Sequence, residues 1–421
     1  MAFIPLVITV AMGMMAGGMV ALALIGPRQT QTLYVVLAAL GVLLGVGAVA
    51  AGPDTAASTY VYDSFNLLLS AFLGYAVTTF FVLSYQVTPD RVLPDPAAIA
   101  AAQAGGAEKT AVLYYVPAEP EHYNARVAAR GFETADYPQA LPPLLARPFA
   151  LQALKRKYAA IRQNTYRTVH FRLAQKVQER LGKRYRVYVA FYNDAPSLAD
   201  AASEALRAGA QRLIVLHPRL TDPPPALHVR DLLAPLRLAR YGVSVRETAP
   251  LWSSELLPRL IVRRALAATD DQDRATAGLL LIGQGHPAPH RYQPKPGVST
   301  VPDPLERQHQ EMAFVKRVRQ ALIKAGFAED NVVLTWWQWQ EPPPAAGLAQ
   351  LAAAGCRHVF WLPVGMLTDC IATLHDIPAA LQAAVPAGVE LRRLGPWNDD
   401  DLLAEALAEK VKQVVASEQL V

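Results

Sequence analysis

The sequence predicts two similar doubly wound parallel-sheet halves preceded by three transmembrane helices. Three observations support this α/β prediction: an N-terminal region almost without charge, apolar runs that alternate with amphipathic helical patterns after residue 109, and a second appearance of that alternation. At 421 residues the chain exceeds what one hydrophobic core usually organises. We therefore predict a three-span anchor at 1–86, a linker at 87–108, and two halves at 109–269 and 270–421.

The N-terminal region has the composition of a membrane segment. Its first 85 residues contain only three charged side chains, Arg28, Asp54 and Asp63. Three uncharged apolar runs each reach the roughly 20 residues that a spanning helix needs. These runs are residues 3–25, 33–51 and 65–85. A cleaved signal peptide is the alternative for the first run, but that run lacks a basic n-region and two further runs follow it.

The basic residues predict how the spans are oriented. Arg28 lies in the first short loop, the loop at 52–64 has two aspartates and no Lys or Arg, and basic residues become frequent from Arg91 onward. The positive-inside rule then puts the N-terminus outside and the C-terminal domain in the cytoplasm. We expect an integral protein of a bacterial inner membrane, with membrane lipid as a partner.

Two pairs of glycines have a spacing that lets membrane helices approach closely. Gly13 and Gly17 lie in the first run, and Gly41 and Gly45 lie in the second. A chance match is the alternative, because glycine is common in membrane helices. Both cysteines belong to the cytoplasmic part, where thiols stay reduced, so no disulfide is expected.

The C-terminal part carries the signature of an internal duplication. The stretch from Ala205, ALRAGAQRLIVLHPRLTD, resembles LAAAGCRHVFWLPVGMLTD from Leu351. Thirty-three residues separate the glycine landmarks in each copy, which are Gly209 and Gly242 in the first and Gly355 and Gly388 in the second. A repeated doubly wound unit explains this equal spacing, and ligands of such folds bind at the carboxyl ends of the strands.

Candidate binding residues follow the first strand of the second half. That strand ends in Gly283 and Gly285, which let a ligand approach the backbone, and then His286, whose imidazole binds metals or accepts protons. An ordinary surface histidine is the alternative interpretation.

A basic stretch between Lys155 and Arg184 reads as one long helix in which Glu179 is the only acid. Anionic lipid headgroups or an acidic ligand would suit it, and a solvated helix face is the alternative. Nucleic acid is not an expected partner, because no groove-reading motif accompanies the charge.

Several motifs of the second half resemble those of class II chelatases, the family of ferrochelatase and the sirohydrochlorin chelatases. His286-Pro287-Ala288-Pro289 resembles the family's H-G-L-P, and WNDDDLLAEALAEKV resembles its closing L-N-D motif. A third stretch resembles P-x-G-F-V-S-D-x-x-E-T-L-x-E. The matching residues are Pro363, Gly365, Asp369, Thr373, Leu374 and Asp376.

The resemblance implies a chelatase-like fold and a site that inserts a divalent metal into a tetrapyrrole. It assigns the base to His286 and the second acidic position to Asp376, and it makes these two residues the metal ligands. The family's main acid falls on Ala372, which neither binds a cation nor moves a proton. The alternative is that Asp369 is only a helix N-cap and Asp376 a solvated side chain.

Aromatic residues of the WWQWQ stretch are candidates for contact with a flat macrocycle. If this stretch is a strand, alternation puts Trp337 and Trp339 on one face, where they would stack on a tetrapyrrole. A buried aromatic strand is the alternative.

Two functions of different class follow from the sequence. One is a membrane-tethered chelatase that acts on a tetrapyrrole with iron or cobalt as the metal. In this function the tetrapyrrole and the metal are ligands, and the sequence assigns no resident cofactor. The other is a catalytically degenerate accessory subunit of a haem- or chlorophyll-containing membrane complex.

Overall fold

The computed structural model describes residues 3–51, 57–84, 95–104, 109–133, 143–222, 229–269, 273–287 and 304–418. The chain forms two compact units, each assembled from separate stretches. The first, which we call the anchor unit, comprises Met1–Arg91, His122–Glu133 and Ala140–Gln163. The second, the α/β unit, comprises Val92–Glu121, Thr134–Gln139 and Asn164–Val421. The predicted domain boundaries at residues 86, 108 and 269 remain predictions.

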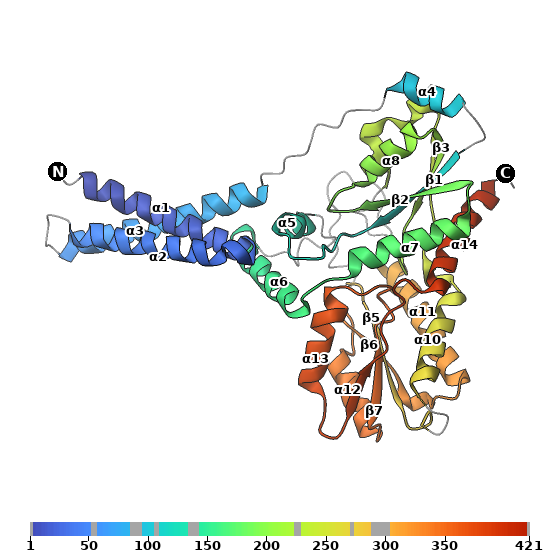
Figure 1. Ribbon diagram of the computed structural model, residues 1–421. Coiled ribbons are helices and arrows are strands. Elements are labelled where there is room, and N and C mark those ends of the chain that lie inside the picture. The colour runs from blue at the N-terminus through green and yellow to red at the C-terminus, as the bar shows by residue number, and fades with distance from the viewer. Residues whose placement is uncertain are drawn as a thin grey trace. The chain divides into compact units, whose positions relative to one another are not determined.

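The anchor unit is built on three long apolar helices, α1 (Phe3–Ile25), α2 (Arg28–Ala50) and α3 (Ala57–Ser84) (Figure 1). All three are long and apolar enough to cross a membrane. A Cβ atom on Gly17 would lie 1.7 Å from the backbone oxygen of Ala71 on α3. The predicted close approach of helices at the glycine pairs is therefore confirmed for Gly17, whose neighbour is α3.

Shorter helices complete the anchor unit. They are α5 (Ala125–Glu133), η2 (Leu144–Ala146) and α6 (Arg147–Ile161). The basic stretch predicted as one helix is in fact two. Helix α6 ends at Ile161, before Arg162, whose φ is +62°, and α7 (Tyr166–Leu181) begins after it in the other unit. The prediction of one continuous helix is wrong, since uninterrupted charge does not reveal a backbone break.

The α/β unit contains two parallel four-stranded sheets with the same strand order. The first sheet has the order β2-β1-β3-β4 and the second β6-β5-β7-β8. The strands are β1 (Lys109–Val116), β2 (Tyr185–Phe191), β3 (Ala210–Leu216), β4 (Ser244–Glu247), β5 (Gly278–Gly283), β6 (Val332–Trp336), β7 (His358–Leu362) and β8 (Glu390–Arg393). This repetition confirms the predicted pair of doubly wound halves.

Helices connect the strands and pack against the sheets. In the first half they are α4 (Pro96–Ala104), α7, α8 (Leu198–Arg207), α9 (Val229–Leu233), η4 (Ala234–Leu236), η5 (Leu238–Tyr241), η6 (Leu251–Ser253) and α10 (Leu256–Ala268). In the second they are α11 (Pro304–Lys324), η8 (Glu329–Asn331), α12 (Pro344–Ala353), η9 (Ala372–Asp376), α13 (Ile377–Ala384) and α14 (Asp401–Glu418). The segment predicted as a linker contains α4, whose Ile99 is buried in the core of the first half.

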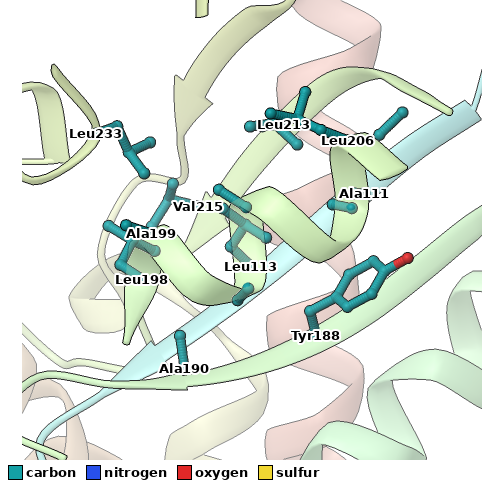
Figure 2. Close-up of a cluster of buried hydrophobic side chains, with 14 of the residues drawn as sticks. Ala111, Leu113, Tyr188, Ala190, Leu198, Ala199, Leu206, Leu213, Val215 and Leu233 are labelled. Carbon is teal, nitrogen blue, oxygen red and sulfur yellow. The ribbon is translucent and has the colours of Figure 1, made fainter. Parts of the chain in front are cut away.

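The first core shows why these residues form these elements. Leu113 of β1, Leu213 of β3 and Leu206 of α8 are fully buried against one another (Figure 2). The helix α8 begins with a capping box between Ser197 and Asp200, which satisfies two backbone N–H groups that the helix leaves open. Burial of each such leucine stabilises the fold by roughly 2 kcal/mol. The sheet is thereby held rigidly enough to position the loops at its strand ends.

Candidate functional site

The loop after β5 is fixed by a buried carboxyl group. Glu311 of α11 accepts hydrogen bonds from the backbone N–H of Gln284, at 2.7 Å, and of Gly285, at 3.0 Å. A Cβ atom on Gly365 would lie 2.1 Å from the nitrogen of Gln284, so the loop after β7 packs closely here. Glu311 was missed in the sequence because a single acid within an amphipathic helix gives no distinctive pattern.

His286 lies beside this carboxyl group. Its Nε2 is 3.4 Å from Oε2 of Glu311, and its backbone oxygen accepts a hydrogen bond of 2.8 Å from Gln308. Burial, with the nearby Arg307 and Arg219, lowers the pKa of His286 to about 3. The imidazole is therefore neutral at pH 7, and one ring nitrogen has a lone pair for a proton or a metal.

Burial has the opposite effect on the acid. It raises the pKa of Glu311 to about 7, although the two backbone N–H donors favour the carboxylate. Near neutral pH the protonated and ionised forms of this carboxyl group are thus both populated. Glu311 and His286 thus form a buried polar pair behind the loop after β5.

The position assigned to the family's main acid lies on an unusual backbone turn. Residues Ala372–Asp376 form a single π-helical turn, η9, which continues into α13. π-Turns of this kind occur frequently at functional sites. The side chain of Ala372 is partly buried and packs with the apolar core of the second half. The residue that the motif resemblance aligns with the family's main acid thus has a methyl side chain.

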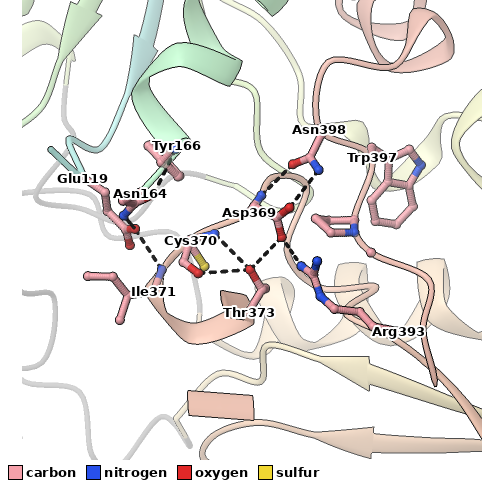
Figure 3. A network of polar contacts seen from close by, with 12 residues as sticks. Glu119, Asn164, Tyr166, Asp369, Cys370, Ile371, Thr373, Arg393, Trp397 and Asn398 are labelled. Atoms are coloured by element: carbon pink, nitrogen blue, oxygen red, sulfur yellow. Dashed lines mark hydrogen bonds and ion pairs between the residues drawn. The ribbon is translucent and has the colours of Figure 1, made fainter. Parts of the chain in front are cut away.

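Two carboxyl groups lie near this turn. Asp376 is 2.8 Å from Nδ1 of His375. Glu119, which follows β1 in the first half, accepts hydrogen bonds from Asn164 at 2.8 Å and from the backbone N–H of Ile371 at 2.9 Å (Figure 3). Burial, and to a lesser degree the charge of Asp376, raises the pKa of Glu119. An acid from one half thus reaches the turn of the other.

Asp369 has a structural role in this loop. Its carboxylate accepts hydrogen bonds from Thr373 at 3.0 Å and from Asn398 at 2.9 Å, and it pairs with Arg393 (Figure 3). The N-cap interpretation is wrong, because the partners of Asp369 are side chains rather than the first N–H groups of the helix. With its oxygens occupied in this way, Asp369 holds the loop in place.

Comparison with known proteins identifies the family. The sequence profile described as Ferrochelatase matches residues 136–415, about two thirds of the chain. The chain belongs to the ferrochelatase family. The predicted class II chelatase resemblance is therefore confirmed. The Ferrochelatase of Geotalea uraniireducens (strain Rf4) is 24% identical over 296 residues, which are 66% of this chain and 88% of that protein.

Other relatives are similarly distant. The Ferrochelatase of Rhodobacter capsulatus is 27% identical over 234 residues, which are 52% of this chain and 62% of that protein. Among solved structures, SirB from Bacillus subtilis with Fe3+ aligns over 74% of this chain and 97% of its own, at 15% identity and a TM-score of 0.46.

The two halves of this ferrochelatase-family unit meet at His170 of α7. Its Nδ1 lies 2.8 Å from the hydroxyl of Tyr114 in β1, and its Nε2 lies 3.2 Å from the hydroxyl of Thr368, after β7. Burial lowers the pKa of His170 to about 3, so it bridges the halves as a neutral imidazole. Partners so distant in sequence gave no signal from which this role was predictable.

The predicted aromatic and glycine positions have packing roles. A Cβ on Gly283 would lie 2.3 Å from the ring of Trp336, and one on Gly285 would lie 1.9 Å from the backbone oxygen of Gln338. Because β6 ends at Trp336, the alternation argument for the two following tryptophans is wrong. Trp337 packs on the second core, whereas Trp339 is 40% exposed. Contact of a tetrapyrrole with the predicted binding residues remains a prediction; these residues are Gly283, Gly285, Trp337 and Trp339.

The structure places the predicted metal ligands in different local environments. His286 is paired with Glu311, and Asp376 is paired with His375. In the described part of the chain, no group of three or more His, Cys, Asp or Glu side chains is arranged to hold a metal ion. A shared site for His286 and Asp376 remains a prediction, and Pro289 of the HPAP motif lies outside the described residues.

The cations of α7 are used within the fold. Each of four basic side chains pairs with an aspartate of the α/β unit. The pairs are Arg167–Asp194, Arg172–Asp399, Lys176–Asp401 and Arg180–Asp401, at 2.7 to 3.2 Å. In the predicted basic stretch, the candidates left for lipid are the cations of α6 and the exposed Arg162, Lys183 and Arg184.

Proposed function

We propose that this protein is a membrane-anchored member of the ferrochelatase family that binds a tetrapyrrole and inserts a divalent metal poorly. The observation that carries the proposal is the pairing of a retained base with a missing acid. His286 lies after β5 beside Glu311, while Ala372 stands at the position that the family motif gives to its main acid. Family membership supports the ligand class, and the substitution supports the weak turnover.

The chemistry explains why binding and turnover separate. Insertion of a metal requires removal of two pyrrole N–H protons from the macrocycle, and a neutral imidazole at His286 is suited to accept one of them. A second acidic or basic group normally contributes about a hundredfold to ten-thousandfold in rate. Ala372 supplies neither function. Glu119 and Asp376 leave two carboxyl groups near the turn, which supports residual rather than zero insertion.

The N-terminal helices support the membrane anchor. Arg28, the first residue of α2, favours a topology with the N-terminus outside and the α/β unit in the cytoplasm of a bacterial cell. Protease added to inside-out vesicles should then digest the α/β unit, while intact spheroplasts protect it. The reverse pattern would contradict this orientation.

Spectroscopic titration tests the proposed function. The full-length protein in nanodiscs is titrated with protoporphyrin and with a sirohydrochlorin-type macrocycle, and ferrous iron or cobalt is then added. We expect a saturable absorbance change on binding and slow insertion of the metal. Rapid insertion would refute the weak turnover, and absence of binding to either macrocycle would refute the proposal as a whole.

A second candidate is an accessory subunit of a haem- or chlorophyll-containing membrane complex. The alanine at position 372 favours it, because a protein without turnover has no need of the acid. This candidate predicts that the protein co-purifies with a pigmented membrane complex and binds no free tetrapyrrole. The two measurements together separate the two functions.

A further inference from the structure

Helix α6 of the anchor unit exposes one coherent face. Every third or fourth residue along it is exposed, from the preceding turn to the end of the helix. These residues are Leu145, Phe149, Ala153, Arg156 and Ala160. Phe149 is 59% exposed and Leu145 is 37% exposed, so the N-terminal part of the face is apolar. The C-terminal part is basic, and α6 contains no acid.

The opposite face binds α6 to the end of the apolar bundle. Leu151 is fully buried in a cluster with Ile25 of α1 and Leu83 of α3. The ammonium group of Lys155 donates hydrogen bonds of 3.0 Å to the backbone oxygens of Ala23 and Gly26. These oxygens are open acceptors at the C-terminus of α1, where a cation is favoured. Figure 1 shows α6 at this end of the bundle.

The N-terminal end of α6 contacts α3 at Tyr75, more than two turns before that helix ends. The hydroxyl of Tyr75 donates a hydrogen bond of 2.6 Å to the backbone oxygen of Leu145, and its ring lies 6.3 Å from that of Phe149. Tyr75 precedes Leu83, the last residue of the apolar span, by eight residues, and at 1.5 Å per residue its backbone lies about 12 Å inside the span. The side chain of Tyr75 is too short to reach from this depth to the end of the span. Leu145 and Phe149, which it contacts, therefore lie at a depth within the apolar span.

Basic groups gather at the other end of the helix. Arg28 and Arg156 lie close enough to Lys155 that, after burial itself, they lower the pKa of its ammonium group. Arg156 and Arg162 are exposed. An oblique helix with an apolar deep end and a cationic shallow end matches the polarity gradient of an anionic leaflet.

We propose that α6 lies obliquely in the cytoplasmic leaflet, with Leu145 and Phe149 among the acyl chains and Arg156 and Arg162 at the phosphates of anionic phospholipids. The proposal rests on the membrane anchor proposed above. It gives the unit a second point of contact with the bilayer, beyond the three spanning helices. Its ligand is the headgroup of an anionic phospholipid rather than free phosphate.

Site-directed fluorescence tests this placement in the full-length protein. The cysteine added by Phe149→Cys carries an environment-sensitive fluorophore in nanodiscs that contain lipids with a quencher on the acyl chain. We expect strong quenching. Leu43→Cys, on an exposed position of α2, reports whether the bundle is in the bilayer, and Ala380→Cys, on the exposed face of α13, is the matched water-exposed control. Labelled wild type gives the background from Cys356 and Cys370.

The outcomes separate the helix from the anchor. Quenching at Leu43 without quenching at Phe149 would overturn the proposal, whereas loss of both would overturn the anchor. Exchange of phosphatidylglycerol for phosphatidylcholine, or the double variant Arg156→Gln/Arg162→Gln, should reduce quenching at Phe149 and leave that at Leu43 unchanged. Equal quenching under all these conditions, or an effect of free phosphate that matches that of phosphatidylglycerol, would refute the role of anionic lipid.

Discussion

The two halves of the α/β unit have the same framework and different strand ends. Both sheets have the same strand order, and the four glycines that predicted the duplication all adopt positive φ: 84° and 62° at Gly209 and Gly242, 88° and 81° at Gly355 and Gly388. Glycine adopts this conformation without steric cost, which explains why the same residue stands at all four positions. The equivalent central strands, however, lead to Glu119 in one half and His286 in the other. A duplicated scaffold thus presents two different chemical groups at equivalent strand ends.

The aspartates of the repeated LTD segments show the same divergence. Asp369 binds Arg393 and Asn398 within its own half. Asp222 reaches across to the second half, where its Oδ2 accepts a hydrogen bond of 2.6 Å from Gln310 and its backbone N–H donates one of 2.9 Å to the same side chain. One copy fixes a loop and the other joins the halves.

The largest effect is expected from restoring the missing acid. Ala372→Glu should raise the rate of metal insertion by about tenfold to a hundredfold, because under the proposed function it restores a carboxylate at the position of the family's main acid. Absorbance after addition of cobalt to the tetrapyrrole-loaded protein measures the rate. The matched control is Ala380→Glu on the exposed face of α13. Equal rates for both variants, or a gain that survives His286→Ala, would show that Ala372 is not the missing position.

Glu311→Gln should change how stability depends on pH. Because folding raises the pKa of Glu311 from 4.5 to about 7, its contribution is fully present below pH 4.5 and is lost as pH rises through 7. The cost of the substitution should therefore shrink by up to about 3 kcal/mol between pH 5 and 8. His286, with a lowered pKa, titrates in the opposite direction in both proteins, so the difference between them isolates the acid.

Thermal unfolding followed by tryptophan fluorescence measures this difference, because all six tryptophans lie in the α/β unit. A cost of substitution that is constant across this pH range would show that Glu311 has an ordinary pKa in the folded protein.

The duplicated aspartates should differ in their effect on stability. Asp369→Ala removes the acceptor of three side chains and should cost about 2–3 kcal/mol, whereas Asp222→Ala, with one partner, should cost about 1 kcal/mol. Chemical denaturation of the two variants tests the order. If tetrapyrrole binding falls more than stability in Asp369→Ala, this aspartate contacts the ligand as well.

The smallest effect is expected at the surface pairs of α7. Asp401 is 71% exposed and pairs with Lys176 and Arg180, so Asp401→Asn should change the melting temperature little, and salt should remove most of the difference. A large salt-resistant loss would show that these charges hold the halves together. That outcome would make the α7 face a structural interface rather than a set of solvated pairs.

The sequence predicted what depends on local pattern. The length of the apolar runs predicted the N-terminal helices, and the spacing of the glycines predicted the repeated sheets. Backbone geometry imposes both the length of a run and the position of a glycine. Three contacts were not predictable, because they join residues 24 to almost 200 positions apart: His286–Glu311, Asp369–Arg393 and His170–Thr368. The break between α6 and α7 was missed because the charge pattern continues through it. Glu119 was missed because its partners, Asn164 and Ile371, lie 45 and 252 residues away in the chain.

The last helix of the chain has a consequence for how the protein is made. α14 packs against α7 and β3 of the first half (Figure 1). Translation delivers the N-terminal spans first and residues 401–418 almost last, so the first sheet remains without this cover until the ribosome is nearly finished. We therefore expect the nascent first half to need protection at the membrane surface, and arrest of translation before residue 400 should leave it sensitive to protease.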